Sequence, residues 1–255
     1  GYPKKLTDSD NSLIGFGVTY EVNETTSVFI GFHEGFTPTG GGADSEEADN
    51  LELGVRYVAE DIFAEFVVFN TDYTNMFGTC TASGGAVGSC DQGDSFNGGA
   101  ASIEGIELAL KKVWKNDKST IFPVSLTYTY TDAQFDSSFK SSFWGNVNSG
   151  MNLPDLPDTQ LALSAGFDME NGFSGEATLY SYGSTCSVAA CTTGTQVDSY
   201  NVIDVSLAKE LSEKIDIYLV VENVTDEEDV VARAPKNGAR AQKPITTTVG
   251  IRYRF

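Results

Sequence analysis

Few residues of this 255-residue chain could carry out chemistry, and they are widely spaced. His33 is the single histidine, so a catalytic triad or a metal site built on several histidines is nearly excluded. Its neighbours predict a place near the end of a strand, beside a loop, where a structural or solvated role is favoured over a ligand role. Two acidic runs, at 44–49 and 226–229, predict solvated loops, with a weak calcium site as the alternative. We therefore expect neither an enzyme nor a bound cofactor.

The four cysteines fall into two pairs, Cys80 with Cys90 and Cys186 with Cys191. Each pair encloses a short stretch rich in Gly, Ser, Thr and Ala. A zinc site is the competing interpretation, but the spacings are not those of a CxxC motif and His33 is distant in sequence. Two local disulfides are therefore predicted, and disulfides indicate an oxidising compartment.

The balance of charge excludes one class of partner. The chain has 36 acidic and 16 basic residues, which give a net charge of −20. Nucleic-acid binding needs a basic surface, so we expect no nucleic-acid partner. No stretch approaches about 18 consecutive apolar residues, the length that a transmembrane helix needs. A slightly polar mean hydropathy still allows a membrane barrel, because each strand turns half of its residues towards a polar lumen.

Period-two alternation of apolar and polar residues is the strongest structural signal. In the last ten residues, 246–255, every second residue from Val249 to Phe255 is apolar, and the residues between are Thr, Gly or Arg. Such alternation predicts a strand with one apolar and one polar face. The same pattern recurs in ten further segments: 13–21, 26–36, 51–58, 62–74, 103–114, 121–131, 159–168, 173–182, 199–208 and 214–222.

The connections between these segments alternate between short and long along the whole chain. Transmembrane barrels combine short periplasmic turns with long extracellular loops, whereas a soluble β-sandwich or propeller does not require this order. Both cysteine pairs lie in long connections. The sequence therefore predicts an all-β protein, an antiparallel transmembrane β-barrel with about eleven strands, short periplasmic turns and long extracellular loops.

Several local motifs resemble, in order, those of TonB-dependent outer-membrane receptors, and in particular of ferric-citrate-type siderophore receptors. The motifs that carry the resemblance are Gly31 to Pro38, Asn50 to Tyr57, Phe96 to Glu107, Leu126 to Thr131, Leu153 to Pro157, Val221 to Asp226 and the terminal Phe255. The run before the last strand, 238–245, departs from the family pattern because it lacks a final arginine.

The resemblance implies a fold and a function. Residues 1–255 would form the C-terminal part of a 22-stranded receptor barrel, with the plug domain and the N-terminal strands absent from this chain. The function would be TonB-dependent import of a ferric siderophore or ferric citrate-like chelate across the outer membrane of a Gram-negative bacterium. The alternatives are a receptor of the same family for a vitamin, haem or a glycan, and a passive porin or structural barrel. The expected partners are the ferric chelate, TonB (through the missing N-terminal region), the barrel-assembly machinery and outer-membrane lipid.

Individual residues have expected roles in such a barrel, of which only the barrel-assembly signal comes from the resemblance itself. Anionic chelates need cations, which Arg233, Lys236 and Arg240 offer in the last long loop. Tyr253 and Phe255 would form the signal that the barrel-assembly machinery reads. Trp114 and Tyr253 fit an interfacial aromatic girdle, although a plain packing role is equally favoured for Trp114. Charges expected to face the lumen and to pair there are Glu52, Arg56, Glu107, Lys111, Glu222, Arg252 and Arg254.

Overall fold

The computed structural model describes residues 11–38, 45–79, 95–97, 99–116, 119–141, 145–233 and 238–255. Within these residues all regular structure is β. No helix in the described ranges is long and apolar enough to cross a membrane.

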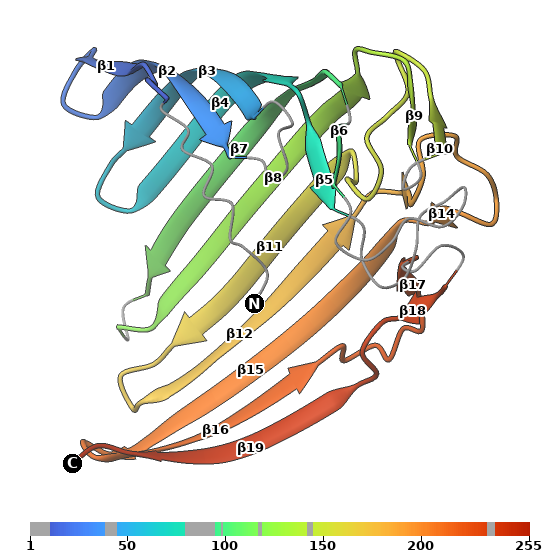
Figure 1. Cartoon of the computed structure of the whole chain (residues 1–255). Coiled ribbons are helices and arrows are strands. Elements are labelled where there is room, and N and C mark those ends of the chain that lie inside the picture. Colours follow the sequence, from blue (N-terminus) through green and yellow to red (C-terminus); the bar gives the residue numbers. More distant parts are fainter. Residues whose placement is uncertain are drawn as a thin grey trace, which may run out of the picture.

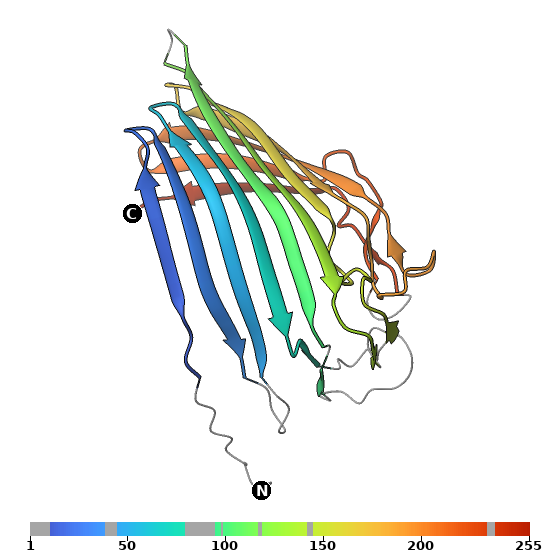
Figure 2. The same ribbon diagram turned by 90° about the horizontal axis from the view of Figure 1, so that it is seen from above.

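One large antiparallel sheet of eleven strands dominates the chain, as predicted. Its strands follow one another in chain order, so each pairs with the next long strand in the sequence. In this order they are β1 (Gly15–Glu21), β2 (Thr26–Thr37), β3 (Glu46–Val58), β4 (Ile62–Thr74), β7 (Ala101–Lys115), β8 (Ile121–Phe135), β11 (Thr159–Asp168), β12 (Phe173–Tyr182), β15 (Tyr200–Ser212), β16 (Ile215–Glu222) and β19 (Thr246–Tyr253). The sheet curls into an open trough, with β1 at one edge and β19 at the other (Figures 1 and 2).

The short and long connections lie at opposite ends of the strands, as the sequence predicts. The turns after β1, β3, β7, β11 and β15 are short and lie together along one rim in Figure 1. The longer connections gather at the other rim. We call these two rims the short-turn side and the loop side.

Four of the long connections contain small two-stranded ladders that the sequence pattern did not predict. These are β5 (Phe77–Thr79) with β6 (Ser95–Asn97), β9 (Phe139–Ser141) with β10 (Gly145–Val147), β13 (Thr185–Cys186) with β14 (Gln196–Val197), and β17 (Val230–Ala232) with β18 (Arg240–Ala241). With two or three residues per strand, these ladders are too short to show an alternation.

Some predicted strand ends were wrong, mostly on the loop side. β3 begins at Glu46 rather than at residue 51, so Glu46, Glu47 and Asp49 belong to a strand and not to an acidic loop. They pair in register with the far end of β2, where Thr37 lies opposite Glu46. His33 lies within β2 rather than at its end. Backbone pairing therefore continues beyond the point where the apolar alternation stops.

The register aligns the apolar alternating positions of neighbouring strands on one face over most of the sheet. Phe32, Leu51 and Asn70 are successive cross-strand partners, and so are Ile30, Leu53 and Val68. The same parity continues through Leu108, Tyr128 and Leu161 to β19, where Val249 lies opposite Leu219. We call this the outward face and the opposite one the inward face.

Glycines on the inward face lie beneath aromatic rings of the neighbouring strand. Gly54 is the cross-strand partner of Phe29, and a Cβ atom at Gly54 would come within 2.2 Å of the ring. Two further pairs have the same arrangement, Gly105 with Phe69 and Gly250 with Tyr218. A ring that lies over a glycine covers backbone that would otherwise face water. The inward face is thus partly covered by its own side chains.

The most deeply buried side chains lie on the loop side and not in the wall. Phe135 and Ala101 have no exposed surface, and they pack with Val147 and Ala189. These residues come from the loop-side ends of β7 and β8, from β10 and from the connection between β13 and β14. The long connections therefore form a packed cap rather than separate loops.

Candidate functional site

The outward face is apolar and exposed, which is the reverse of a soluble sheet. On this face Leu53 is 54% exposed and Ile251 is 73% exposed. Gly54, which lies between Leu53 and Val55 in the sequence and faces inward, is buried. Further exposed apolar side chains on this face include Phe16, Val18, Ile30, Leu51, Val55, Phe66, Val68, Leu110 and Val249. A contiguous apolar surface of this extent marks an interaction with another apolar phase.

Aromatic side chains border this apolar surface on the short-turn side. They lie at the short-turn ends of β1, β3, β7, β8 and β19, and they are Tyr20, Tyr57, Trp114, Phe122 and Tyr253. All of them are exposed on the outward face. Rings in this position match the girdle that lies at the headgroup level of a membrane, so the girdle interpretation of Trp114 is favoured over packing.

Four of the seven charges predicted to pair in the lumen form ion pairs: Arg56, Glu222, Arg252 and Arg254. Arg56 on β3 bonds Glu65, its cross-strand partner on β4, and its guanidinium lies 5.3 Å from the centre of the Phe29 ring. Asp216 on β16 accepts from Arg254 at 2.5 Å, and Arg252 lies 4.0 Å away. Because these pairs are partly exposed, each contributes little to stability, about 0–1 kcal/mol. Their effect is to keep charges on the wall rather than in the lumen.

One buried side chain, Asn223, holds the base of the last long connection. Its Nδ2 donates to the carbonyl oxygens of Glu227, at 3.0 Å, and Lys243, at 2.9 Å, while its Oδ1 accepts from the backbone N–H of Glu227. Its own N–H donates to Asp204 Oδ1. Asn223 has a φ of 50°, a left-handed conformation that asparagine tolerates better than most residues. The two ends of the connection are thus tied together by one amide.

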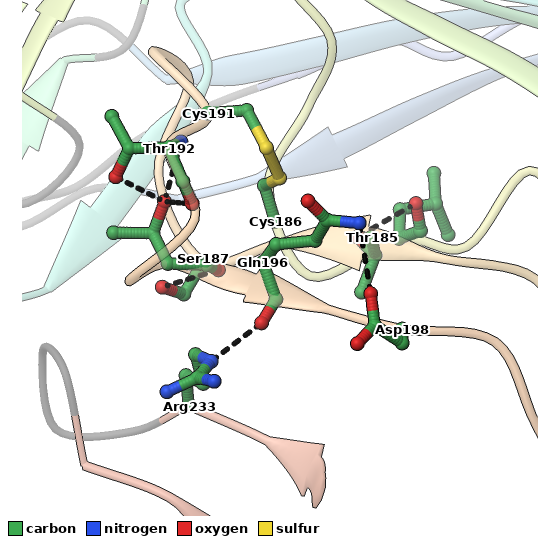
Figure 3. The surroundings of a disulfide bond; sticks show 10 residues. Thr185, Cys186, Ser187, Cys191, Thr192, Gln196, Asp198 and Arg233 are labelled. Atoms are coloured by element: carbon green, nitrogen blue, oxygen red, sulfur yellow. Dashed lines mark hydrogen bonds between the residues drawn. A yellow bond between two sulfur atoms is a disulfide. The ribbon is translucent and has the colours of Figure 1, made fainter.

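A disulfide closes the hairpin formed by β13 and β14 on the loop side. Cys186 and Cys191 are bonded, with their Cα atoms 5.6 Å apart. Inside the hairpin, Thr195 bonds Thr192 through backbone and hydroxyl groups, and Ser187 donates to the Thr195 carbonyl (Figure 3). The Cys186 carbonyl accepts from the N–H of Asp155 in the preceding long connection. Partial desolvation there raises the pKa of the Asp155 carboxyl.

Arg233, one of the three predicted substrate ligands, contacts this hairpin. Its Nε donates to the Gln196 carbonyl at 2.5 Å (Figure 3). Arg240 lies nearby, because it is the cross-strand partner of Ala232. Lys236 and the cysteine pair Cys80 and Cys90 lie outside the described residues. The structure therefore brings together two of the three cations that the sequence singled out.

Loop-side residues within the described ranges line two cavities. One, of about 400 Å³, lies over the loop-side ends of β2, β3 and β4, and its lining includes His33, Glu46, Glu52, Thr71 and Tyr73. There Asn50 bonds Glu52 at 2.7 Å and Thr71 at 2.6 Å. The other, of about 470 Å³, lies between two long connections beside the disulfide. No cluster of three or more potential metal ligands occurs among the described residues.

A family model for the β-barrel of TonB-dependent receptors matches residues 4–224. The chain belongs to the TonB-dependent receptor-like β-barrel family. Its match covers most of the eleven-stranded sheet, and the residues after 224 hold most of the last long connection and β19. The outward face is therefore the lipid-facing wall of an outer-membrane barrel in a Gram-negative bacterium. The family consists of receptors and transporters rather than enzymes.

Solved structures share the fold at low sequence identity. The siderophore receptor PiuA from Acinetobacter baumannii is 19% identical with a TM-score of 0.73, covering 94% of this chain and 35% of its own. The ferric-catecholate import receptor Fiu from E. coli K12 is 19% identical with a TM-score of 0.71, covering 94% and 34%. The copper transporter OprC is 12% identical with a TM-score of 0.72, covering 94% and 39%. The chain spans little more than a third of each, so its sheet is one part of a larger barrel.

Sequence reasoning missed several residues that shape the site. In the sequence, Asn223 stands out only as part of a family motif, Val221 to Asp226, and its hydrogen bonds have no signal of their own. Gln196, which accepts from Arg233 through its backbone, has no side-chain signal at all. Glu65, the partner of Arg56, becomes apparent only when the register of β3 and β4 is known.

We predict that a cation on the outward face destabilises the barrel, whereas the same cation on the inward face is tolerated. Leu53→Arg in the barrel that contains this chain should cost about 2–4 kcal/mol, because its charge would face hydrocarbon. Thr127→Arg, on the inward face of β8, is the matched control and should cost far less. Urea titration of the barrel folded into lipid vesicles measures both. Equal losses would contradict the assignment of the faces.

We also predict that Asn223→Ala loosens the last long connection selectively. The change removes the side-chain partner of two carbonyl groups and one N–H, and each lost hydrogen bond should cost about 0.5–1.5 kcal/mol, because water can reach these part-buried groups. Amide hydrogen exchange should accelerate within 224–245 and stay unchanged in β7 and β8. Asn201→Ala, which removes an exposed amide from β15, is the control. Uniform acceleration through the wall would show that Asn223 supports the whole sheet instead.

Proposed function

We propose that this chain forms the C-terminal part of the barrel of a TonB-dependent receptor that imports a ferric siderophore or ferric citrate-like chelate. The family match over residues 4–224 is the observation that carries the proposal. Structures with the same fold include a ferric-catecholate import receptor and a siderophore receptor. In the proposed receptor, β1 and β19 pair with strands outside this chain, and a plug domain fills the lumen and couples to TonB.

The loop side supplies the proposed capture surface. Arg233 uses its Nε for the Gln196 carbonyl, so its two terminal nitrogens remain as donors for the paired oxygens of an anionic chelate. Arg240 follows on the neighbouring strand, and Lys236 lies in the sequence between them. We propose these three cations as substrate ligands. Tyr253 and Phe255, whose rings lie 5.2 Å apart on the outward face, are proposed as the signal for the barrel-assembly machinery.

A second candidate is a receptor of the same family for another substrate. The fold is shared with a copper transporter at a TM-score of 0.72, so the fold alone does not select iron. A passive porin is a third candidate, and it differs from both receptors in needing no energy input.

Uptake of radioactive iron by a deletion strain separates these candidates. Complementation with the complete gene should restore uptake of ferric citrate or of a ferric siderophore, and loss of TonB should abolish it. Restoration that persists without TonB would favour the porin. No restoration with any ferric chelate, together with normal barrel assembly, would remove iron as the substrate and leave the family assignment intact.

We predict that Arg233→Gln weakens binding of an anionic ferric chelate by about 10- to 100-fold, because a hydrogen bond to a charged group contributes about 1.5–3 kcal/mol. Lys115→Gln, an equal loss of charge on the short-turn side, is the control and should leave binding unchanged. Titration of the full receptor by intrinsic fluorescence measures both affinities. An effect of similar size for both variants would indicate a general field of charge rather than a contact at Arg233.

A further inference from the structure

Two shallow apolar furrows lie on the outward face near its short-turn end, one on each side of Leu207. Each has a volume of about 330 Å³. The first lies between β8 and β15, and its outward-facing lining is Phe122, Ala165, Phe167, Gly175, Ala177, Val205 and Leu207. The second lies between β12 and β19, and its outward-facing lining is Phe173, Leu207, Lys209, Ile217, Leu219 and Val249.

Differences in side-chain size create the first furrow. Ala165, Gly175 and Ala177 are small residues on the adjacent strands β11 and β12, and larger side chains border them. Phe167 and Leu207 are the cross-strand partners of Gly175 and lean over it. A Cβ atom at Gly175 would lie 2.7 Å from Leu207 and 2.8 Å from Phe167. The furrow is therefore a feature of the side chains on a wall whose backbone pairing is continuous.

A cation marks the short-turn end of the second furrow. Lys209 lies opposite Phe173 in the register, and its Nζ donates to the carbonyl oxygen of Asn171 in the turn between β11 and β12. An ammonium group has three donors, so this bond leaves two for another acceptor. Phe173 is the first residue of β12 after this short turn, and its ring lies 5.2 Å from that of Phe167, so this end of the furrow lies at the short-turn rim that the aromatic girdle borders. Lipid phosphates lie at this depth of a membrane, and basic side chains attract them.

We propose that the two furrows hold the two acyl chains of one glycerophospholipid from the leaflet on the short-turn side, with its phosphate beside Lys209. Three observations support this occupant. The furrows continue the lipid-facing surface, their lining is almost entirely apolar, and their single cation lies where the phosphate of such a lipid would be. A second barrel is a poor occupant, because two convex walls touch along a narrow line and leave furrows empty. The proposal rests on the position of the wall in the membrane and not on the transported substrate.

Native mass spectrometry of the full receptor tests the acyl-chain sites. The receptor is loaded with phosphatidylglycerol in detergent and washed, and the retained lipid is counted. Ala165→Leu combined with Ala177→Leu should fill the first furrow and reduce retention about tenfold, because several methylene groups lose their buried position. Ala64→Leu, on the outward face of β4, is the matched control and should retain lipid like the wild type. A heat-dependent shift in gel mobility confirms that each variant is a folded barrel.

Replacement of the cation tests the headgroup site separately. Lys209→Gln should reduce retention of phosphatidylglycerol about tenfold and leave retention of diacylglycerol, which lacks the phosphate, unchanged. Equal retention by the furrow-filling variant and the wild type would overturn the proposal. So would an equal effect of Lys209→Gln on the two lipids, or a receptor dimer that Ala177→Leu abolishes while lipid retention stays constant.

Discussion

The need to pair every backbone N–H and C=O group within the sheet is the constraint on which the rest of this structure depends. Hydrocarbon offers no hydrogen bonds, so a wall that faces lipid must satisfy its backbone from strand to strand. The register then becomes as important as the pairing, because a slip of one residue would turn every apolar side chain to the lumen. The parity of the outward positions is kept from β1 to β19. The bulge at Glu210 and Ser212 lies at the short-turn end of β15, where a change of face costs least.

This constraint moves the packed core away from the wall. A single sheet with lipid on one side and a lumen on the other cannot bury large side chains between layers. Its wall is held mainly by the backbone hydrogen bonds between strands and by pairs of side chains on neighbouring strands. Where the strands leave the hydrocarbon, water returns and a conventional core becomes possible. The buried side chains of Phe135, Val147 and Val197 lie in that region. The loop side is therefore the part whose shape depends on side-chain packing, and the part where substitutions can change a binding surface.

The same division explains how much the sequence could predict. The bounds of β4, β11 and β12 were predicted correctly, because Asp61 and Gly172 mark the reversals in the adjoining short turns. The start of β3 was missed, since Glu46, Glu47 and Asp49 are polar on both faces once the strand has left the lipid. The hairpin of β13 and β14, the amide network of Asn223 and the contact between Arg233 and Gln196 depend on distant partners. The period-two alternation of apolar and polar residues contains no information on contacts between residues that are distant in the sequence.

On the loop side, acidic side chains line the two cavities described above, whereas the cations lie elsewhere. The cavity over β2, β3 and β4 includes Glu46 and Glu52, and no lysine or arginine occurs among its described lining residues. The cavity beside the disulfide includes Asp158 and again no basic side chain in its described lining. Arg233 and Arg240 lie on or next to β17 and β18 and are not among the lining residues of either cavity. In the proposed receptor, we expect the carboxylates of the first cavity to repel a negatively charged chelate and the arginine beside the hairpin to attract it.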